Sequence, residues 1–217
     1  MAKAIVAGAS GLIGGLLLEY LLQSPAYQEV VVIVRNKLPV EHKKLKQLVV
    51  DFNQLGNYAD EINGHAIFCC LGTTRKKTPD QAAYRRIDHD YPLQLAQMGV
   101  KNGVAQYHLV SVLGANPDTP GFYLKMKGET EDDIKATGLK CLHIYRPSLL
   151  TGDRKEKRTE EKIATVLSRI IDPILIGGLK KYRSIPAKTV AMAMYKQSLK
   201  HQEGVFIHLS DQIKELS

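Results

Sequence analysis

A chain of 217 residues and 24.1 kDa has the size of one ordinary domain, or of one domain with a small appendage. Its composition, 44% hydrophobic and 24% charged, excludes a disordered chain and provides a core that needs no disulfide or metal ion. The three cysteines, Cys69, Cys70 and Cys141, are odd in number and not in metal-ligand spacing, which indicates a reducing compartment and no metal site.

The net charge of +8 is spread over many short basic groups, and no run reaches five like charges. We therefore expect no nucleic-acid partner. The two apolar stretches, residues 16–22 and 163–179, are interrupted by polar residues, and no targeting signal precedes the first strand-like run. These features predict a cytoplasmic protein without membrane contact, in which residues 163–179 form a candidate homodimer interface.

Apolar runs and helical spacing alternate along the chain. The predicted strands cover residues 3–7, 30–34, 48–50, 66–71, 107–112, 142–145 and 205–209. The predicted helices cover residues 12–22, 84–99, 122–137 and 189–199. Strands that alternate with helices indicate an α/β fold with a doubly wound parallel sheet. We interpret residues 1–217 as a single domain, in which residues 148–217 form a small extension on the substrate side.

The first strand leads into a glycine turn that opens the first helix, with the sequence Gly8-Ala9-Ser10-Gly11-Leu12-Ile13-Gly14. Glycines here let the backbone turn sharply and approach a pyrophosphate, which the amide groups and positive dipole end of the helix attract. The spacing is G-x-x-G-x-x-G, and its place at the start of a βαβ pattern predicts a dinucleotide-binding Rossmann fold.

Arg35 follows the second predicted strand, where an NAD-selective site usually has an acidic residue that binds the ribose 2′-hydroxyl. A guanidinium there can bind a 2′-phosphate through charge-assisted hydrogen bonds. The sequence therefore favours NADP(H) over NAD(H). The alternative is a surface arginine without a ligand.

Three further residues have the chemistry of proton transfer. Tyr123 and Lys127 are four residues apart, so they share one face of the predicted helix, and an ammonium beside a phenol lowers its pKa. Ser111 ends the fifth predicted strand, where its hydroxyl could bind a substrate oxygen. All three are expected at the carboxyl edge of the sheet, where ligands of such folds bind. They are the candidate catalytic residues.

Together these features resemble the short-chain dehydrogenase/reductase superfamily, in its extended or atypical branch, and more narrowly the Tat-interacting-protein-like group and its small bacterial relatives. Besides the glycine turn, the matching motifs are Cys70-Leu71-Gly72-Thr73-Thr74-Arg75, Asp88-His89-Asp90-Tyr91, Ser111-Val112-Leu113-Gly114-Ala115-Asn116, Tyr123-Leu124-Lys125-Met126-Lys127-Gly128-Glu129, Tyr145-Arg146-Pro147-Ser148 and Gly152-Asp153-Arg154. They lie in family order over about residues 1–160, and the last fifty residues match weakly.

The resemblance implies how the remaining residues contact the cofactor. Asp51 and Phe52 would lie near the adenine, and Leu71, Gly72 and Thr73 along the ribose and phosphates. Pro147 would approach the nicotinamide carboxamide, and Lys127 would also bind the nicotinamide ribose. The cofactor-binding residues of the glycine turn would be Gly8, Ser10, Gly11, Leu12, Ile13 and Gly14. Val112 and Leu113 stand where relatives have further serines, which leaves Ser111 as the strand-end hydroxyl.

The favoured function is an NADP(H)-dependent oxidoreductase acting on a small-molecule carbonyl or alcohol. The intact Tyr123/Lys127 pair favours an enzyme. Two alternatives stay open: an enzyme similar to sugar-nucleotide epimerases, which retains and recycles its cofactor, and a non-catalytic module that senses the cofactor and acts through a partner protein. The short region after Arg146 favours the module.

Three other polar sites are interpreted as structural. His89 stands between two aspartates, where we expect a solvated or capping side chain. His108 lies inside a predicted strand and is expected in the core. Asp132 and Asp133 are expected on an exposed helix face and do not form a catalytic pair.

Overall fold

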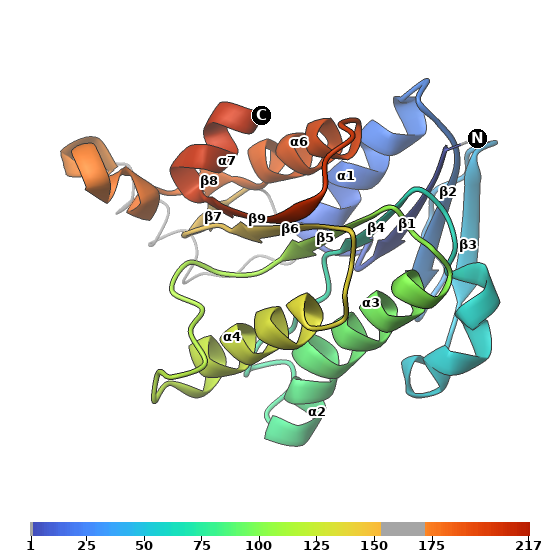
Figure 1. The fold of residues 1–217 in the computed structure, drawn as a ribbon, viewed down its shortest axis with the longest axis horizontal. Helices are drawn as coiled ribbons and strands as arrows, with labels where there is room; N and C mark the ends of the chain where they lie inside the picture. The colour runs from blue at the N-terminus through green and yellow to red at the C-terminus, as the bar shows by residue number, and fades with distance from the viewer. Residues whose placement is uncertain (1, 153–171) are drawn as a thin grey trace.

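A parallel sheet forms the centre of the computed structural model, which describes residues 2–152 and 172–217 (Figure 1). Its strands are β1 (Ala2–Ala7), β2 (Tyr27–Val34), β3 (Leu45–Val49), β4 (Ala66–Cys69), β5 (Gln106–Val110), β6 (Cys141–Arg146) and β9 (Gly204–Leu209). They lie in the order β3-β2-β1-β4-β5-β6-β9, and each neighbouring pair is parallel. The predicted doubly wound α/β fold is confirmed.

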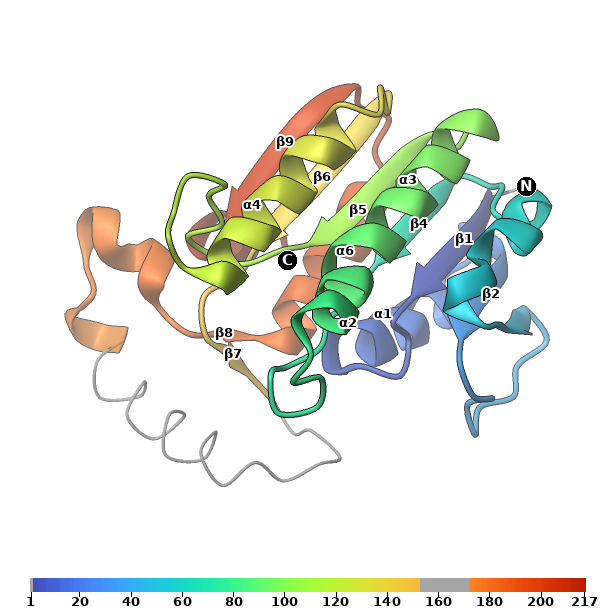
Figure 2. The ribbon, with the colours of Figure 1, turned by 90° about the horizontal axis from the view of Figure 1, so that it is seen from below.

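Helices cover both faces of this sheet. The α-helices are α1 (Leu12–Gln23), α2 (Gln81–Arg85), α3 (Tyr91–Lys101), α4 (Phe122–Lys135), α6 (Ala187–Ser198) and α7 (Ser210–Leu216). Figure 1 shows α1, α6 and α7 on one face and α3 and α4 on the other, and Figure 2 shows α3 and α4 side by side. The chain order reverses between β1 and β4, which places a crevice for ligands at the carboxyl ends of the strands.

Residues along β1 alternate between two hydrophobic cores. Ala4 and Val6 pack in the core beneath α1 and α6, whereas Ile5 and Ala7 pack in the core beneath α3. Because both faces of the central strands are buried, these strands consist of continuous apolar runs, which made them easy to recognise in the sequence. At the edge of the sheet, β3 is only half-buried and contains Lys46 and Gln47, so the predicted strand 48–50 began three residues too late.

The predicted helix over residues 84–99 is a longer helical segment in three parts. It begins with α2, continues through a π-helical turn, η2 (Arg86–Asp90), and ends with α3. Short π-helical turns are frequent at functional sites, because the wider turn changes the direction in which its side chains point. Here the turn contains Asp88 and His89, and both side chains are buried.

The C-terminal segment adds one strand to the sheet and two helices to the face that α1 covers. The predicted helix 189–199 corresponds to α6, which packs on α1, and the predicted strand 205–209 corresponds to β9. The remaining elements are the strand pair β7 (Leu150–Thr151) and β8 (Ile185–Pro186) and the 3-10 helices η1 (Phe52–Glu61), η3 (Asp172–Ile174) and η4 (Gly177–Tyr182). Residues 163–171 of the predicted dimer interface lie outside the described residues.

Aromatic rings form a ladder across four neighbouring strands. The side chains of Phe68, His108, His143 and Phe206 stand beside one another on β4, β5, β6 and β9. Their ring centroids are 4.7, 4.7 and 4.9 Å apart in that order. His108 is fully buried, as predicted. His143 is also buried, and its Nδ1 lies 3.0 Å from Nε2 of His208.

These histidines predict a loss of stability in acid. Burial, the largest cause, lowers the pKa of His143 and of His208 to about 4; the neighbouring His208 and Lys200 contribute to the lowering at His143, and Lys200 to that at His208. Histidines in the unfolded chain take up protons near pH 6.5. The unfolded state therefore binds more protons between these values, and the free energy of unfolding falls as the pH drops from about 6.5 to about 4.

Thermal unfolding between pH 7 and pH 4.5 checks this prediction. The double variant His143→Phe/His208→Phe, which removes both titrating rings, should lose less of its melting temperature over this range than the wild type. Equal losses in the two proteins would contradict the role of these rings.

Candidate active site

The loop between β1 and α1 lies directly against the end of β4. Gly8 has a φ of +87°, and a Cβ atom built on it would lie 2.4 Å from the carbonyl oxygen of Cys70. A Cβ atom on Gly14 would lie 2.3 Å from the carbonyl oxygen of Gly8. Side chains are not accommodated at such distances, so glycine at these two positions is what allows α1 to start so close to the sheet.

The first turn of α1 directs backbone N–H groups toward this loop. The Gly15 N–H donates to the Gly11 carbonyl over 2.9 Å. The N–H groups of residues 12–14 come before this bond in the first turn, where helix N–H groups can bind a ligand. The first turn of α1 contains no acidic residue, and Ser10 is exposed beside it. This helix start therefore fits the negative charge of a pyrophosphate.

The other residues expected at the cofactor also follow strands at this edge. Arg35 is exposed directly after β2. Asp51 follows β3, and its carboxylate accepts a hydrogen bond from the Asn53 N–H over 2.9 Å. Phe52 is buried, with its ring centroid 5.3 Å from that of Tyr91. The remaining positions are Leu71, Gly72 and Thr73 after β4, and Pro147 after β6.

Lys127 is buried in α4, where it forms an ion pair with an aspartate from η2. The Lys127 Nζ lies 3.1 Å from Oδ1 of Asp88, and both side chains are almost completely inaccessible. The other carboxylate oxygen of Asp88 accepts a hydrogen bond from the Thr73 N–H over 2.8 Å. Burial lowers the pKa of Lys127, but the charge and hydrogen bond of Asp88, together with the neighbouring Tyr123 and Cys69, raise it by more, so the pKa is raised overall and the ammonium stays protonated.

Ser111 is held by a second buried ion pair. Its hydroxyl donates to Oε1 of Glu131 over 2.5 Å, and Arg146 donates to both oxygens of the same carboxylate. Glu131 is fully buried, and Ser111 is 6% exposed. Its strand-end position predicts a hydroxyl directed to a substrate, but the Ser111 proton points to Glu131.

Tyr123 lies in the first turn of α4, four residues before Lys127, and is 40% exposed. Its ring centroid lies 6.3 Å from that of Tyr84 in an edge-to-face arrangement. Partial burial raises the pKa of Tyr123, Lys127 lowers it, and Asp88 raises it again, with a net upward direction. The expected lowering by Lys127 is thus present but outweighed.

A small pocket of about 220 Å³ adjoins Tyr123. Its aromatic wall consists of Tyr84, Phe122 and Tyr123, and Arg75 is the charged residue among its lining residues. The pocket is open to solvent and lies beside the phenol that we expect to transfer protons. It is the candidate substrate-binding pocket of the described residues.

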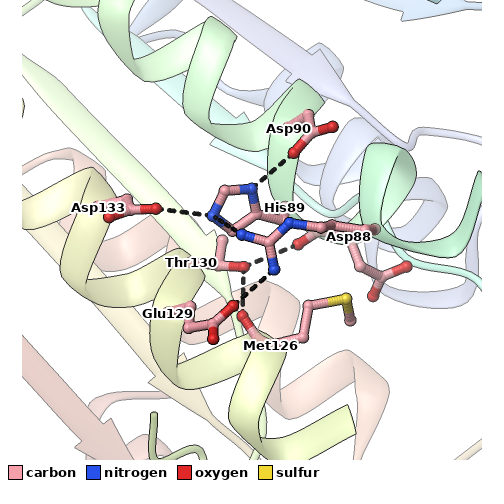
Figure 3. Close-up of polar contacts among 8 residues, drawn as sticks. Asp88, His89, Asp90, Met126, Glu129, Thr130 and Asp133 are labelled. Atoms are coloured by element: carbon pink, nitrogen blue, oxygen red, sulfur yellow. Dashed lines mark hydrogen bonds and ion pairs between the residues drawn. The ribbon is translucent and has the colours of Figure 1, made fainter. Parts of the chain in front are cut away.

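Figure 3 shows a polar network between η2 and α4, in which His89 is enclosed by carboxylates. His89 Nδ1 lies 2.7 Å from Oδ1 of Asp90, and Nε2 lies 2.8 Å from Oδ2 of Asp133. Arg85, from α2, forms an ion pair of 2.6 Å with Glu129. The prediction of a solvated or capping His89 was wrong, because this face of η2 packs on α4 and buries the imidazole. The network fixes the two elements that carry Asp88 and Lys127.

The sequence predicted Tyr123 and Lys127 on one face of a helix, but it did not reveal two buried carboxylates. Asp88 pairs with Lys127 and Glu131 pairs with Arg146, and nothing in the local pattern distinguishes these carboxylates from surface ones. One usable signal was the spacing of Lys127 and Glu131, four residues apart, which places Glu131 on the same face of the helix as Lys127.

Comparison with known proteins agrees with this geometry. A protein family described as NAD(P)H-binding matches residues 8–199. The chain belongs to this family. It is 34% identical to Protein HTATIP2 of Rattus norvegicus over 193 residues, which cover 87% of the chain and 78% of that protein. It is 32% identical to the mitochondrial protein fmp52 of Aspergillus clavatus over 213 residues, which cover 94% of the chain and 90% of that protein.

A solved structure, MoeE5 in complex with UDP-glucose and NAD, has the same fold. Its TM-score is 0.71 at 17% identity, over 97% of this chain and 79% of that one. These findings confirm the resemblance to atypical short-chain dehydrogenases and establish binding of a pyridine nucleotide as the family's property. The name of the fungal relative gives no support to a cytoplasmic location, which stays a prediction. Within residues 2–152 and 172–217, no helix has the length and apolar character needed to cross a membrane.

The buried Glu131 carboxylate predicts a sharp loss of stability when its charge is removed. In Glu131→Gln the Arg146 guanidinium keeps its charge in a largely buried place without a counter-ion. Breaking such a pair costs about 3 kcal/mol of unfolding free energy. Urea unfolding measures this cost.

Glu61→Gln is the matched control, because Glu61 pairs with Lys46 at the surface. Its unfolding curve should stay close to that of the wild type. Equal small effects of the two substitutions would contradict a structural role for the Glu131 charge.

Proposed function

We propose that the protein is an NADP(H)-dependent oxidoreductase that transfers a hydride between the nicotinamide and a small carbonyl or alcohol compound. The observation that carries the proposal is the placement of Tyr123 and Lys127. They lie one turn apart on α4, at the carboxyl edge of a pyridine-nucleotide-binding sheet, and Tyr123 lines a pocket. A phenol in such a position can exchange a proton with a substrate oxygen.

The residues at this edge fit a dinucleotide. Glycine at positions 8 and 14 lets the turn and the start of α1 lie against the end of β4, and the amide groups of residues 12–14 would bind the oxygens of the pyrophosphate. Arg35 would bind a 2′-phosphate, and Asp51 and Phe52 would lie near the adenine. Leu71, Gly72 and Thr73 would lie along the ribose and phosphates. Pro147 would approach the nicotinamide carboxamide, and Lys127 would bind the nicotinamide ribose.

The bound nicotinamide would supply or accept the hydride, and side chains of the protein would transfer the proton. In the direction of reduction, the Tyr123 phenol donates its proton to the carbonyl oxygen of the substrate. In the direction of oxidation, the phenolate takes the hydroxyl proton from the alcohol. Lys127 stabilises the phenolate by its charge, since its ammonium remains protonated beside Asp88.

The pocket supports a small substrate. Its volume of about 220 Å³ is below the roughly 300–1,000 Å³ usual for drug-sized ligands, and aromatic rings form its wall. A compact, largely apolar carbonyl compound suits this space better than a sugar nucleotide does. The Arg75 guanidinium at the pocket favours a substrate with an anionic group.

One observation favours a second candidate, a cofactor-binding module without turnover. The Ser111 hydroxyl donates to Glu131, so its proton is not directed to a substrate. In the module, binding of the cofactor would alter the surface around α4 and act through a partner protein. The two candidates differ in whether cofactor is consumed.

Arg35 predicts the choice of cofactor. A charge-assisted contact between its guanidinium and a 2′-phosphate should make NADPH bind about ten- to a hundredfold more tightly than NADH. Arg35→Ala should remove most of this difference, while Lys37→Ala, a nearby exposed cation, should retain it. Calorimetric titration of the three proteins with both cofactors measures the effect. Equal affinities in the wild type would overturn the assignment of Arg35.

Tyr123 predicts the kinetic effect of losing the proton donor. Tyr123→Phe should lower kcat by about a hundredfold or more, with cofactor affinity unchanged, because the ring is retained and the hydroxyl is lost. A panel of small carbonyl compounds assayed by NADPH consumption provides the measurement. An unaltered kcat would exclude Tyr123 as the donor, and a wild type that binds NADPH but consumes none with any compound would favour the module.

A further inference from the structure

The candidate substrate-binding pocket has one charged side chain among apolar ones. Arg75 lines it beside the aromatic wall, and no carboxylate is among its described lining residues. Arg75 is exposed, and within residues 2–152 and 172–217 no acidic side chain forms an ion pair with it. Arg85 differs, because Glu129 neutralises it at 2.6 Å. The pocket thus contains a guanidinium whose counter-ion a ligand can supply.

Hydrogen bonds hold the loop that carries Arg75 against the aromatic wall. The Tyr84 hydroxyl donates to the main-chain carbonyl of Thr73 over 3.1 Å. The loop also closes on itself, because the hydroxyls of Thr73 and Thr78 are 2.8 Å apart and the Thr78 N–H donates to the Thr74 carbonyl over 2.8 Å. Arg75 therefore belongs to a short closed loop that is anchored to one ring of the pocket, which limits the positions that its guanidinium can reach.

The rings of the wall favour a flat, apolar substrate body. The Tyr84 ring stands nearly perpendicular to those of Phe122 and Tyr123, at 78° and 79°, and its centroid lies 5.8 and 6.3 Å from theirs. Phe122 is 36% exposed and Tyr123 40%, so both rings have surface that a ligand can contact. Aromatic pairs are stabilised beyond the area that they bury. A single aromatic ring suits this wall and the pocket volume of about 220 Å³.

We propose that the substrate is an aromatic aldehyde or ketone that carries a carboxylate, and that Arg75 selects for this carboxylate. The guanidinium would bind both carboxylate oxygens through charge-assisted hydrogen bonds. The carbonyl carbon would accept the hydride of NADPH and the carbonyl oxygen the Tyr123 proton, which yields an alcohol and NADP⁺ and leaves the carboxylate unchanged. The inference rests on the proposed function and names the substrate class of the same pocket.

The charge of the whole chain also attracts an anionic substrate. The net charge is +8, and Lys76, next to Arg75, is exposed as well. Such long-range attraction is screened by salt and is shared by all surface cations. It raises the encounter rate of any anion, whereas a contact with Arg75 depends on that one side chain. Substitution of the two neighbouring cations, one at a time, separates these effects.

Binding of three probes to the protein saturated with NADP⁺ provides the test without turnover, because NADP⁺ has no hydride to transfer. The probes are para-acetylbenzoate, its uncharged methyl ester, and the cyclohexane analogue of the acid, which lacks the aromatic ring. In calorimetry at pH 7, the acid should bind about tenfold more tightly than the ester. It should bind about threefold more tightly than the cyclohexane analogue.

Arg75→Gln should remove the preference for the acid over the ester, because glutamine can donate a hydrogen bond but has no charge. Lys76→Gln is the matched control, since it removes a neighbouring exposed charge that does not line the pocket, and it should keep the preference. Equal affinities of acid and ester in the wild type, or an equal loss in both variants, would overturn selection by Arg75. A cyclohexane analogue that binds as tightly as the acid would overturn the aromatic class.

Turnover with NADPH gives a second readout. Arg75→Gln should raise KM for para-acetylbenzoate about tenfold and leave kcat nearly unchanged, because the carboxylate contact is the same in the ground state and the transition state. If the wild type binds the acid through Arg75 but consumes no NADPH, the proposed function fails and the carboxylate site stands. If it reduces acid and ester with equal KM, the proposed function stands and the inference about Arg75 fails.

Discussion

The close contact between the β1–α1 turn and the end of β4 is the constraint on which the site depends. At Gly8 a Cβ atom would lie 2.4 Å from the Cys70 carbonyl oxygen, and at Gly14 it would lie 2.3 Å from the backbone of Gly8 itself. The absence of both side chains brings the amino end of α1 to the point where the strand order reverses. The positive end of the helix thereby lies beside the loop that follows β4, and a dinucleotide bound there can extend along the carboxyl edge of the sheet.

Two buried ion pairs organise the other half of the site. An ammonium as deeply buried as that of Lys127 requires a counter-charge, and Asp88 supplies it from a π-helical turn. Glu131, one turn farther along α4, accepts hydrogen bonds from both the Arg146 guanidinium and the Ser111 hydroxyl. The face of α4 toward the sheet edge therefore has nearly balanced charge. Tyr123 remains at its exposed end, where a substrate can reach it.

The parts of this arrangement that follow from local patterns could be predicted from the sequence. Continuous apolar runs identified the central strands, and the spacing of Gly8, Gly11 and Gly14 predicted the tight turn between β1 and α1. The positions of Asp88 and Glu131 depend on which helices pack together, and a carboxylate on a helix has the same local pattern whether it is buried or exposed. The same reason explains His89, which was expected in solvent but is covered by α4. The strand β3 was placed late because its edge position leaves it half polar.

The central claim is that a pyridine nucleotide binds in the Gly8–Gly14 turn and extends along the carboxyl edge to Lys127. The most direct measurement is a titration of ¹⁵N-labelled protein with NADPH, followed by amide chemical shifts. The account predicts saturable changes concentrated in residues 8–14 and 71–73, near Arg35 and at the start of α4. Saturable changes confined to another surface, or no saturable changes at millimolar NADPH, would contradict it.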